Sequence, residues 1–449
     1  MRYLVRSCPI IVRAKRLTVI LAFVALLGTA FAIAAIRAAR QPVYEGKTVP
    51  QWVMQYSTSP YMGEKEEAVE ALQTMPDEVS RYLIQRSLAY GNTGFWRKWH
   101  GFAKRLPPAW SQWLSPYDPD RADEILWQLR PSAAAVLPLL KGSLSRTNTQ
   151  FYNHAIWLLG SLGEGGEQAV PYLVQACAST NRFTRILAVQ SLEHLGPGAR
   201  GAEAALVNAL QDNSTRLRAI VALGHIGPPA IAAKPLIQAR LASTNLQERL
   251  SAAAALHRIA PEEGTIQLLA QAAGSTNEAN QGALVGLILA DLGPAARPIV
   301  PALLRVLRED HSAWNGNSRA NRAWGILNGL RRIDPTNHEV VDILLEKLPA
   351  ADKWRVNAAG YTDLDIALWL VRFDPGEPTG VKVLSHYVQR KNAGDASFGF
   401  AIEELRKAGP AAKAAIPALK AAAADPNKEI RKAARWALKA IEEGRKPTI

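Results

Sequence analysis

The chain has 449 residues, of which 48% are hydrophobic, and its 2 Cys exclude a small disulfide-rich domain. The formal net charge of +14 is typical of a nucleic-acid-binding protein, but residues 1–40 and 405–449 each carry +7, so residues 41–404 carry no net charge. The middle of the chain therefore lacks the positive field that holds a phosphate backbone, which argues against nucleic acid as a partner.

The amino-acid usage favours an all-α fold. Aromatic residues make up only 7% of the chain, and the apolar residues are mostly Ala and Leu. These two residues favour helices, whereas the β-branched and aromatic residues that strands prefer are sparse.

Residues 17–36 form a run of twenty residues without a charge. As a helix, at about 1.5 Å per residue, this run covers the roughly 30 Å of a bilayer core. The basic residues of segment 1–16 precede it, so the positive-inside rule predicts a cytosolic N-terminus. We therefore expect a single-pass protein of the inner (cytoplasmic) membrane, with the rest of the chain extracytoplasmic, in the periplasm.

A cleaved signal peptide is the alternative for the same segment. Ala32, Ile33 and Ala34 have the small-x-small form of a cleavage site. The apolar run is, however, longer than the about 7 to 15 residues of a signal peptide. An uncleaved anchor is therefore the favoured prediction.

Residues 37–63 read as a linker with one short helix around Trp52, and residues 91–120 read as an insertion rich in Gly, Pro and Trp. On a helix, the aromatic side chains of the insertion would lie opposite basic ones, as in a helix at a membrane interface. A satellite core, a partner surface and a sugar-stacking surface remain open. The candidate contact residues are Trp96, Arg97, Lys98 and Trp99.

Apolar dipeptide junctions recur at a period of about 33 residues. They are Leu129-Arg130, Leu162-Gly163, Leu195-Gly196, Ile226-Gly227, Ile259-Ala260 and Leu292-Gly293. An Asn precedes each of the last five, at Asn148, Asn181, Asn213, Asn245 and Asn277. A Pro follows several of them, at Pro138, Pro171, Pro235, Pro301 and, in the last repeat, Pro417.

This spacing predicts a helical hairpin in each repeat. Asn caps the start of a helix, a left-handed Gly ends it, and Pro is tolerated in a first turn or at a kink. One hairpin cannot bury its apolar face by itself, but stacked neighbours can. We therefore predict an α-solenoid of stacked hairpins over residues 64–444, with weaker junctions at Ile333-Asp334 and Phe373-Asp374.

Two segments carry the resemblance to a known family: Asp212–Pro228 and Asp425–Leu438. Both are similar to the Asp, Arg, Ala, Ala, Leu-Gly consensus of HEAT repeats, in the short bacterial form. The resemblance implies an armadillo-like helical array that binds proteins. Members of the family also include DNA-binding proteins, glycosylases of alkylated bases and bilin lyases, so these activities remain alternatives.

Residues 405–444 read as a basic terminal repeat that caps the array. Its last helix carries cations three and four residues apart, which form one stripe. The stripe could bind anionic lipid or an acidic partner, or be a solvated face. Its members are Lys428, Arg431, Lys432, Arg435 and Lys439.

The remaining polar patterns do not predict chemistry. His194 and His225 precede their junctions by two residues, at a position that holds Ser161, Arg258 and Asp291 in other repeats, so polar helix ends explain them better than a metal site. The Gly-x-Gly-x-x-Gly pattern at residues 196–201 follows a predicted helix rather than a strand. Cys177 reads as a buried apolar thiol.

The sequence therefore predicts a membrane-anchored extracytoplasmic scaffold or adaptor that binds an unidentified protein partner. No catalytic, cofactor-binding or metal-binding residue is predicted. An envelope-structure protein that contacts lipid or polysaccharide is a further alternative.

Overall fold

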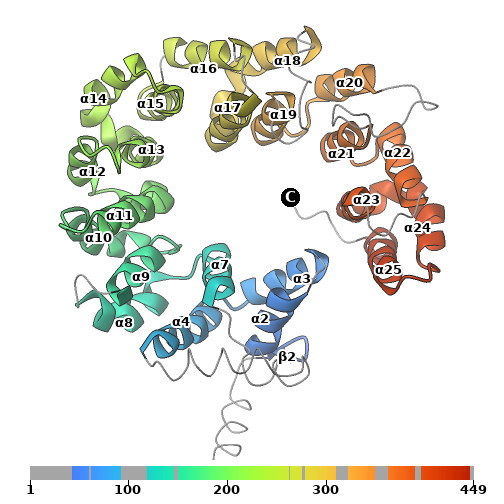
Figure 1. Ribbon diagram of the computed structural model, residues 1–449, viewed down its shortest axis with the longest axis horizontal. Helices are drawn as coiled ribbons and strands as arrows, with labels where there is room; N and C mark the ends of the chain where they lie inside the picture. The colour runs from blue at the N-terminus through green and yellow to red at the C-terminus, as the bar shows by residue number, and fades with distance from the viewer. Residues whose placement is uncertain are drawn as a thin grey trace, which may run out of the picture. The chain divides into compact units, whose positions relative to one another are not determined.

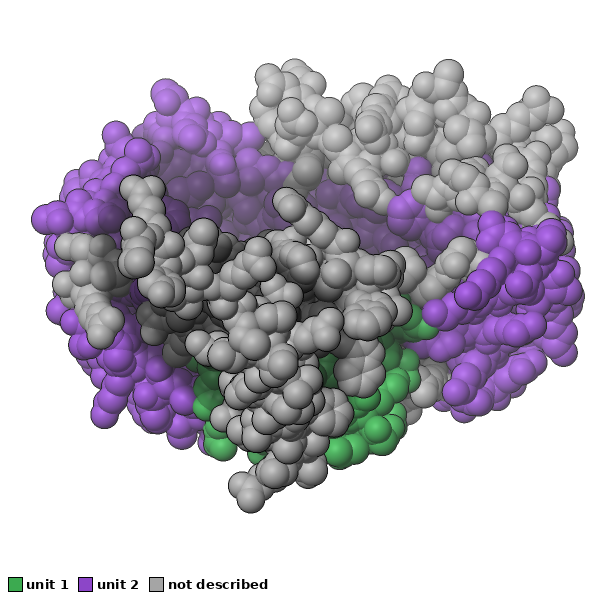
Figure 2. Space-filling view, turned by 60° about the horizontal axis from the view of Figure 1, so that its bottom comes forward, with its two compact units in different colours: residues 1–59, 64–125 green, residues 60–63, 126–449 purple. Residues whose placement is uncertain are grey.

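The computed structural model describes residues 43–59, 62–92, 119–145, 150–261, 263–275, 279–309, 322–348, 363–389 and 396–444. The chain divides into two compact units (Figure 2). The first contains residues 1–59 and 64–125, and the second contains residues 60–63 and 126–449. The expected membrane segment 17–36, most of the Trp-rich insertion, and the predicted caps Asn148 and Asn277 lie outside the described residues.

The described part of the first unit starts with an antiparallel pair of two-residue strands, in which Val43 pairs with Thr48. The Trp52 side chain is 1% exposed, and its indole N–H donates to the Tyr44 carbonyl oxygen at 3.1 Å. This contact packs the helix that follows against the strands. The elements are β1 (Val43–Tyr44), β2 (Lys47–Thr48), α2 (Val49–Thr58), α3 (Met62–Gln73) and α4 (Pro76–Asn92).

The helix α7 (Pro119–Leu129) leads into the second unit, where the helices alternate between two layers (Figure 1). Each odd-numbered helix from α11 onward packs on the odd-numbered helix before it. The odd-numbered helices are α9 (Gln150–Leu159), α11 (Arg182–Leu195), α13 (Arg216–Ile226), α15 (Leu246–Ile259), α17 (Ala279–Leu292), α19 (Arg322–Ile333), α21 (Asp363–Phe373), α23 (Ala396–Ala408) and α25 (Lys428–Glu442).

The even-numbered helices form the other layer, with α10 against α12 and α16 against α18. They are α8 (Ala133–Leu144), α10 (Val170–Cys177), α12 (Glu203–Ala209), α14 (Lys234–Gln238), α16 (Glu263–Ser275), α18 (Val300–Glu309), α20 (His338–Lys347), α22 (Pro378–Gln389) and α24 (Ile416–Ala422). Short 3₁₀ turns connect the layers at η1 (Gly166–Ala169), η2 (Gly196–Ala199), η3 (Pro228–Ala233), η4 (Ala239–Ala242), η5 (Gly293–Ile299) and η8 (Gly409–Ala415).

The hydrophobic core passes from one repeat to the next. One cluster of buried side chains extends from Leu250 to Phe373, and another extends from Leu364 to Ile441. Each helix pair therefore buries its apolar face against its neighbours, which is the packing of a helical-repeat array. The all-α, helical-repeat prediction is confirmed.

The predicted helix ends occur at most junctions. Gly196 and Gly227 have φ of 57° and 77°, a region that favours glycine. Pro171, Pro235, Pro301 and Pro417 are each the second residue of an even-numbered helix, while Pro138 lies inside α8. Two junctions differ from the expectation, because the left-handed residue is Gly165 rather than Gly163, and Ala260 is extended with a φ of −151°.

The predicted Asn caps are confirmed in two of the described repeats. The Asn181 side chain accepts from the Phe183 N–H at 2.9 Å, and Asn245 accepts from the Glu248 N–H at 3.2 Å. The prediction for Asn213 is wrong, because α13 begins three residues later, at Arg216. There the Asp212 carboxylate organises the turn by accepting from the Ser214 N–H at 2.8 Å.

Three arginines at equivalent positions each tie a turn between layers to the helix that follows it. Arg185 donates to the carbonyl oxygens of the residues six and five positions before it, at 3.1 and 3.2 Å. Arg249 makes the same pair of contacts, at 2.7 and 3.1 Å. Arg431 does so as well, at 2.6 and 2.7 Å. This is the structural role of the arginine in the repeat pattern.

Candidate functional site

A polar groove crosses the ends of several odd-numbered helices in the second unit. The position two residues before the junction lies in the last turn of α11, α13, α15 and α17, and its side chains there line a cavity of about 550 Å³. The charged and imidazole side chains of this polar groove are Arg130, Glu193, His194, His225, Arg258 and Asp291.

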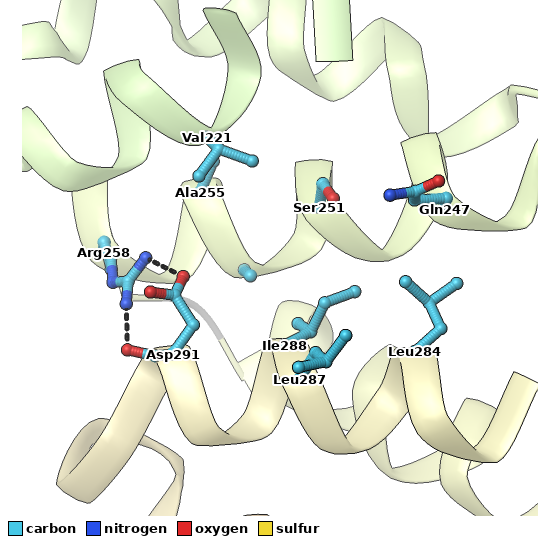
Figure 3. A pocket seen from close by; sticks show the side chains of 10 residues that line it. Val221, Gln247, Ser251, Ala255, Arg258, Leu284, Leu287, Ile288 and Asp291 are labelled. Carbon is cyan, nitrogen blue, oxygen red and sulfur yellow. Dashed lines mark hydrogen bonds and ion pairs between the residues drawn. The ribbon is translucent and has the colours of Figure 1, made fainter. Parts of the chain in front are cut away.

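Three of these side chains form one network although they come from three helices. The Nε2 atom of His225 lies 3.1 Å from both carboxylate oxygens of Asp291, which is 66 residues away in sequence. Arg258 lies between them in sequence and donates from Nη1 to Asp291 Oδ2 at 2.8 Å. Its Nη2 atom also donates to the Asp291 carbonyl oxygen (Figure 3). The network therefore joins the ends of α13, α15 and α17.

The partners of His225 favour its charged form. The Nδ1 atom of His225 lies 2.9 Å from the Glu193 carbonyl oxygen, and Nε2 faces the Asp291 carboxylate. Both partners are acceptors, so both contacts are hydrogen bonds when both ring nitrogens carry protons. Burial opposes this charge, but the hydrogen bonds to Asp291 and Glu193 outweigh burial and raise the pKa of His225.

Asp291 lies where a helix does not favour an acid. The C-terminal end of a helix carries partial negative charge, so cations are stabilised there and carboxylates are not. Burial also acts against the Asp291 charge, but hydrogen bonds from His225 and Arg258 prevail and hold the pKa of Asp291 well below its usual range. His225 and Arg258 thus form a site that binds a carboxylate, and the carboxylate of Asp291 in the same protein occupies it.

The other half of the polar groove has a different charge balance. The Glu193 carboxylate pairs with Arg218 at 3.1 Å. His194 uses Nδ1 on the Gln190 carbonyl oxygen at 2.7 Å, and its ring meets Trp127 edge-on at 4.3 Å between centroids. Arg130 is exposed, and within the described part of the chain it has no ion pair. Arg130 and the Nε2 atom of His194 are therefore available to a ligand.

An apolar cavity of about 150 Å³ adjoins the polar groove between α15 and α17. Arg258 and Asp291 line both spaces, so the two adjoin at this ion pair. Leu284, Leu287 and Ile288 of α17 point toward α15 across this cavity (Figure 3). The Leu287 side chain is 63% exposed, which is unusual for a large apolar residue.

Of the site residues predicted from the sequence, those of the Trp-rich insertion are not described, and those of the basic stripe lie on α25. Trp96, Arg97, Lys98 and Trp99 lie outside the described residues. On α25, Lys428, Lys432, Arg435 and Lys439 are exposed, whereas Arg431 is half-buried in its backbone contacts. Arg431 therefore has a structural role in the turn before α25.

The structure describes the surroundings of His225, which the sequence analysis considered as a metal ligand, and of Cys177, which it considered as a buried thiol. His225 binds Asp291 and a carbonyl oxygen, and the described residues contain no group of His, Cys, Asp or Glu that could hold a metal ion. Burial raises the pKa of the Cys177 thiol to about 12, so at neutral pH it is a poor nucleophile.

Sequence reasoning treated the row of polar helix ends as independent residues and missed the network. The network could have been inferred from the negative charge of Asp291. Asp291 is an acid at a helix C-terminus, and the same position in the two preceding repeats holds His225 and Arg258. An acid at this disfavoured place predicts a nearby cation.

No protein-family model matches the chain, and no curated protein matches it. Solved structures similar to it include an engineered protein with 16% identity, which covers 88% of this chain and 99% of its own, with a TM-score of 0.30. The complex of CpcE and CpcF of phycocyanin lyase from Nostoc sp. is 23% identical, covers 51% of this chain and 95% of its own, and has a TM-score of 0.30.

The karyopherin Kap121p, bound to the extreme C-terminus of the protein phosphatase Cdc14p, is 12% identical with a TM-score of 0.39. The match covers 88% of this chain and 50% of that karyopherin, so the chain spans half its length. These likenesses are too distant to transfer a function. The helices and their contacts define the fold of this protein.

One stretch of the described residues, Leu284–Glu309, is long and apolar enough to cross a membrane. It comprises the second part of α17, η5 and all of α18, and 44% of its most apolar window is buried. Its side chains belong to the hydrophobic core cluster, as Leu289 and Leu303 show. The stretch is therefore accounted for by packing within the array.

Proposed function

We propose that this protein is a membrane-anchored, extracytoplasmic HEAT-type scaffold or adaptor that binds a protein partner without catalysing a reaction. The observation that carries the proposal is that the polar groove and the cavity between α15 and α17 adjoin at the Arg258–Asp291 ion pair. One surface carries paired charges, two available basic groups and an exposed leucine. This combination is typical of a site that binds another protein rather than a small substrate.

The location is part of the same proposal. Residues 17–36 would anchor the chain in the inner membrane with segment 1–16 in the cytosol. A phosphatase reporter that is active only outside the cytosol, fused after Ile449, tests this topology. Activity of the fusion supports the proposal, and a fusion that is active only with a cytosolic reporter overturns it.

Partner binding through the groove is tested by photo-crosslinking in cells. A photoreactive amino acid replaces Leu287, next to the cavity, or Ile231, which is 52% exposed on η3 and does not line either space. We expect one dominant adduct from position 287 and none from position 231. Equal adducts from both positions, or none from position 287, would contradict the proposal.

A further inference from the structure

The polar groove and the adjoining apolar cavity, together called the groove below, contain Arg130 and the Nε2 atom of His194. Neither of these groups has an acidic partner in the described structure. On the basis of the proposed scaffold function, we infer that the groove binds an extended peptide segment. The segment places a leucine- or phenylalanine-sized side chain between α15 and α17, and a carboxylate at Arg130 and His194.

The size and lining of the cavity indicate the apolar anchor. A cavity of about 150 Å³ with an aliphatic portion to its lining is large enough for a benzene ring. Val221, Leu284 and Ile288 provide such a lining, and a bound side chain would also cover Leu287. Burial of this apolar surface is the main source of favourable free energy for such a contact.

The polar residues at the same cavity suit the main chain of a peptide. Gln247 and Ser251 lie one turn apart on α15 and line the cavity (Figure 3). An amide group and a hydroxyl group can each donate and accept hydrogen bonds. They match the N–H and C=O groups of an extended segment better than they match a purely apolar ligand.

The charge balance of the polar groove indicates the carboxylate. Each acid that lines it already has a cation: Glu193 pairs with Arg218, and Asp291 pairs with Arg258. Arg130 is the remaining cation, and His194, whose Nδ1 binds the Gln190 carbonyl oxygen, joins it by donating from Nε2 in its doubly protonated form. The groove already shows the same chemistry once, because His225 and Arg258 together hold the Asp291 carboxylate. A second carboxylate, supplied by the ligand, would complete the pattern.

The separation of the two features requires an extended ligand. The cavity and His194 are separated by α13 and α15, and packed helices lie about 8–10 Å apart. The span from α11 across α13 and α15 to the cavity is therefore roughly 20–25 Å. An extended chain advances about 3.3 Å per residue, so about six to eight residues cover it.

The carboxylate could come from an Asp or Glu side chain or from a peptide C-terminus, and both have the same chemistry at Arg130. The test begins with selection of a random peptide display library on the full-length protein in nanodiscs. We expect enrichment of peptides in which an apolar residue and a carboxylate are separated by a constant spacing. The enriched peptide is then synthesised with a free or an amidated C-terminus, which separates the two sources.

Two variants and one control test the two ends of the groove. For Arg130→Glu we expect acidic residues to disappear from the selected peptides, and binding of the original peptide to weaken at least about tenfold in fluorescence anisotropy. For Leu287→Lys we expect the apolar anchor to be lost. Ile231→Lys is the matched control and should bind like the wild type. Circular dichroism of each variant verifies folding.

Three results would overturn the inference: no selected peptide that depends on the groove, selected peptides without a carboxylate, or equal binding by Leu287→Lys and Ile231→Lys. These results are distinguishable from failure of the scaffold function. If crosslinking at position 287 still captures a partner, the scaffold function stands and only the ligand class is wrong. Absence of crosslinking removes the scaffold function itself.

Discussion

The two sides of α17 are packed in opposite ways. Toward α19, Gly286 lies so close to Gly325 that a Cβ atom would overlap the Gly325 backbone. Toward α15, Leu284, Leu287 and Ile288 border an open cavity of about 150 Å³. The tight side has no room for a ligand, and the open side does. Consecutive residues of one helix, Gly286 and Leu287, therefore contribute to packing and to the candidate site respectively.

The largest expected effect is on the tight side. Gly286→Ala would push the new methyl group into the Gly325 backbone, which cannot move away as a flexible side chain could. We expect a loss of about 2 kcal/mol in the free energy of unfolding, measured by urea titration with circular dichroism. Gly264→Ala on α16 is the control, because a Cβ there meets nothing within 4 Å. Similar losses in both variants would show that the close contact is not the cause.

A variant of the charge network tests whether ion pairs stabilise the packing of α17 on the side that faces α15. Asp291→Asn removes the acceptor charge that His225 and Arg258 share. We expect a loss of about 1 kcal/mol near pH 6, since the Asp291 side chain is 41% exposed and solvent weakens the interaction. Glu339→Gln, which removes a surface ion pair with Arg308, is the control and should cost less.

The same variant should change the dependence of stability on pH. The pKa of His225 is raised in the folded state, so its stabilising contribution is complete below its ordinary value of 6.5 and is lost as the pH rises through the raised value. The pKa of Asp291 is lowered, so its contribution is lost only in acid, below its ordinary value of 3.8.

Wild-type stability should therefore decrease as the pH rises above about 6.5, and Asp291→Asn should reduce that decrease. Urea midpoints across this range provide the measurement. The other charged groups near His225 are Glu193, Arg218 and Arg258, and none of them changes in the variant. A variant with the wild-type pH dependence would contradict the assignment to His225 and Asp291.

An added side chain on the open side should have the opposite sign to one on the tight side. Ala254 is buried and lines the cavity, so Ala254→Leu would fill space that is now empty. We expect a gain of about 0.5–1 kcal/mol in stability, together with weaker peptide binding. Thermal unfolding and anisotropy measure the two effects. A strong destabilisation would mean that the cavity cannot accept a side chain.

The smallest expected effect on stability comes from Leu287→Lys. The side chain is mostly exposed, so the change should alter the free energy of unfolding by no more than about 0.5 kcal/mol. Urea titration beside Gly286→Ala compares neighbouring positions directly. If Leu287→Lys destabilises as much as Gly286→Ala, Leu287 is part of the packing and the contrast between the two sides fails.

Local features of the fold could be predicted because local chemistry decides them. The left-handed glycines and the first-turn prolines follow from backbone sterics, and Gly227 and Pro235 occur as expected. Asn213 shows where this reasoning stops. Its neighbours Asp212 and Thr215 compete for the same turn, and the Asp212 carboxylate also binds Arg185 of the previous repeat at 2.8 Å. A contact between repeats thus decided which residue organises the turn.

The sequence by itself determined an all-helical array. Residues that start and end helices recur at a period of about 33 residues, so the same local structure forms in each repeat. The tertiary structure alone decided the site. Whether the end of α13 reaches that of α17, so that His225 meets Asp291, depends on how each helix pair is set against the next. Glycine contacts, cavities and ion pairs between repeats determine that setting, and no periodic pattern specifies them.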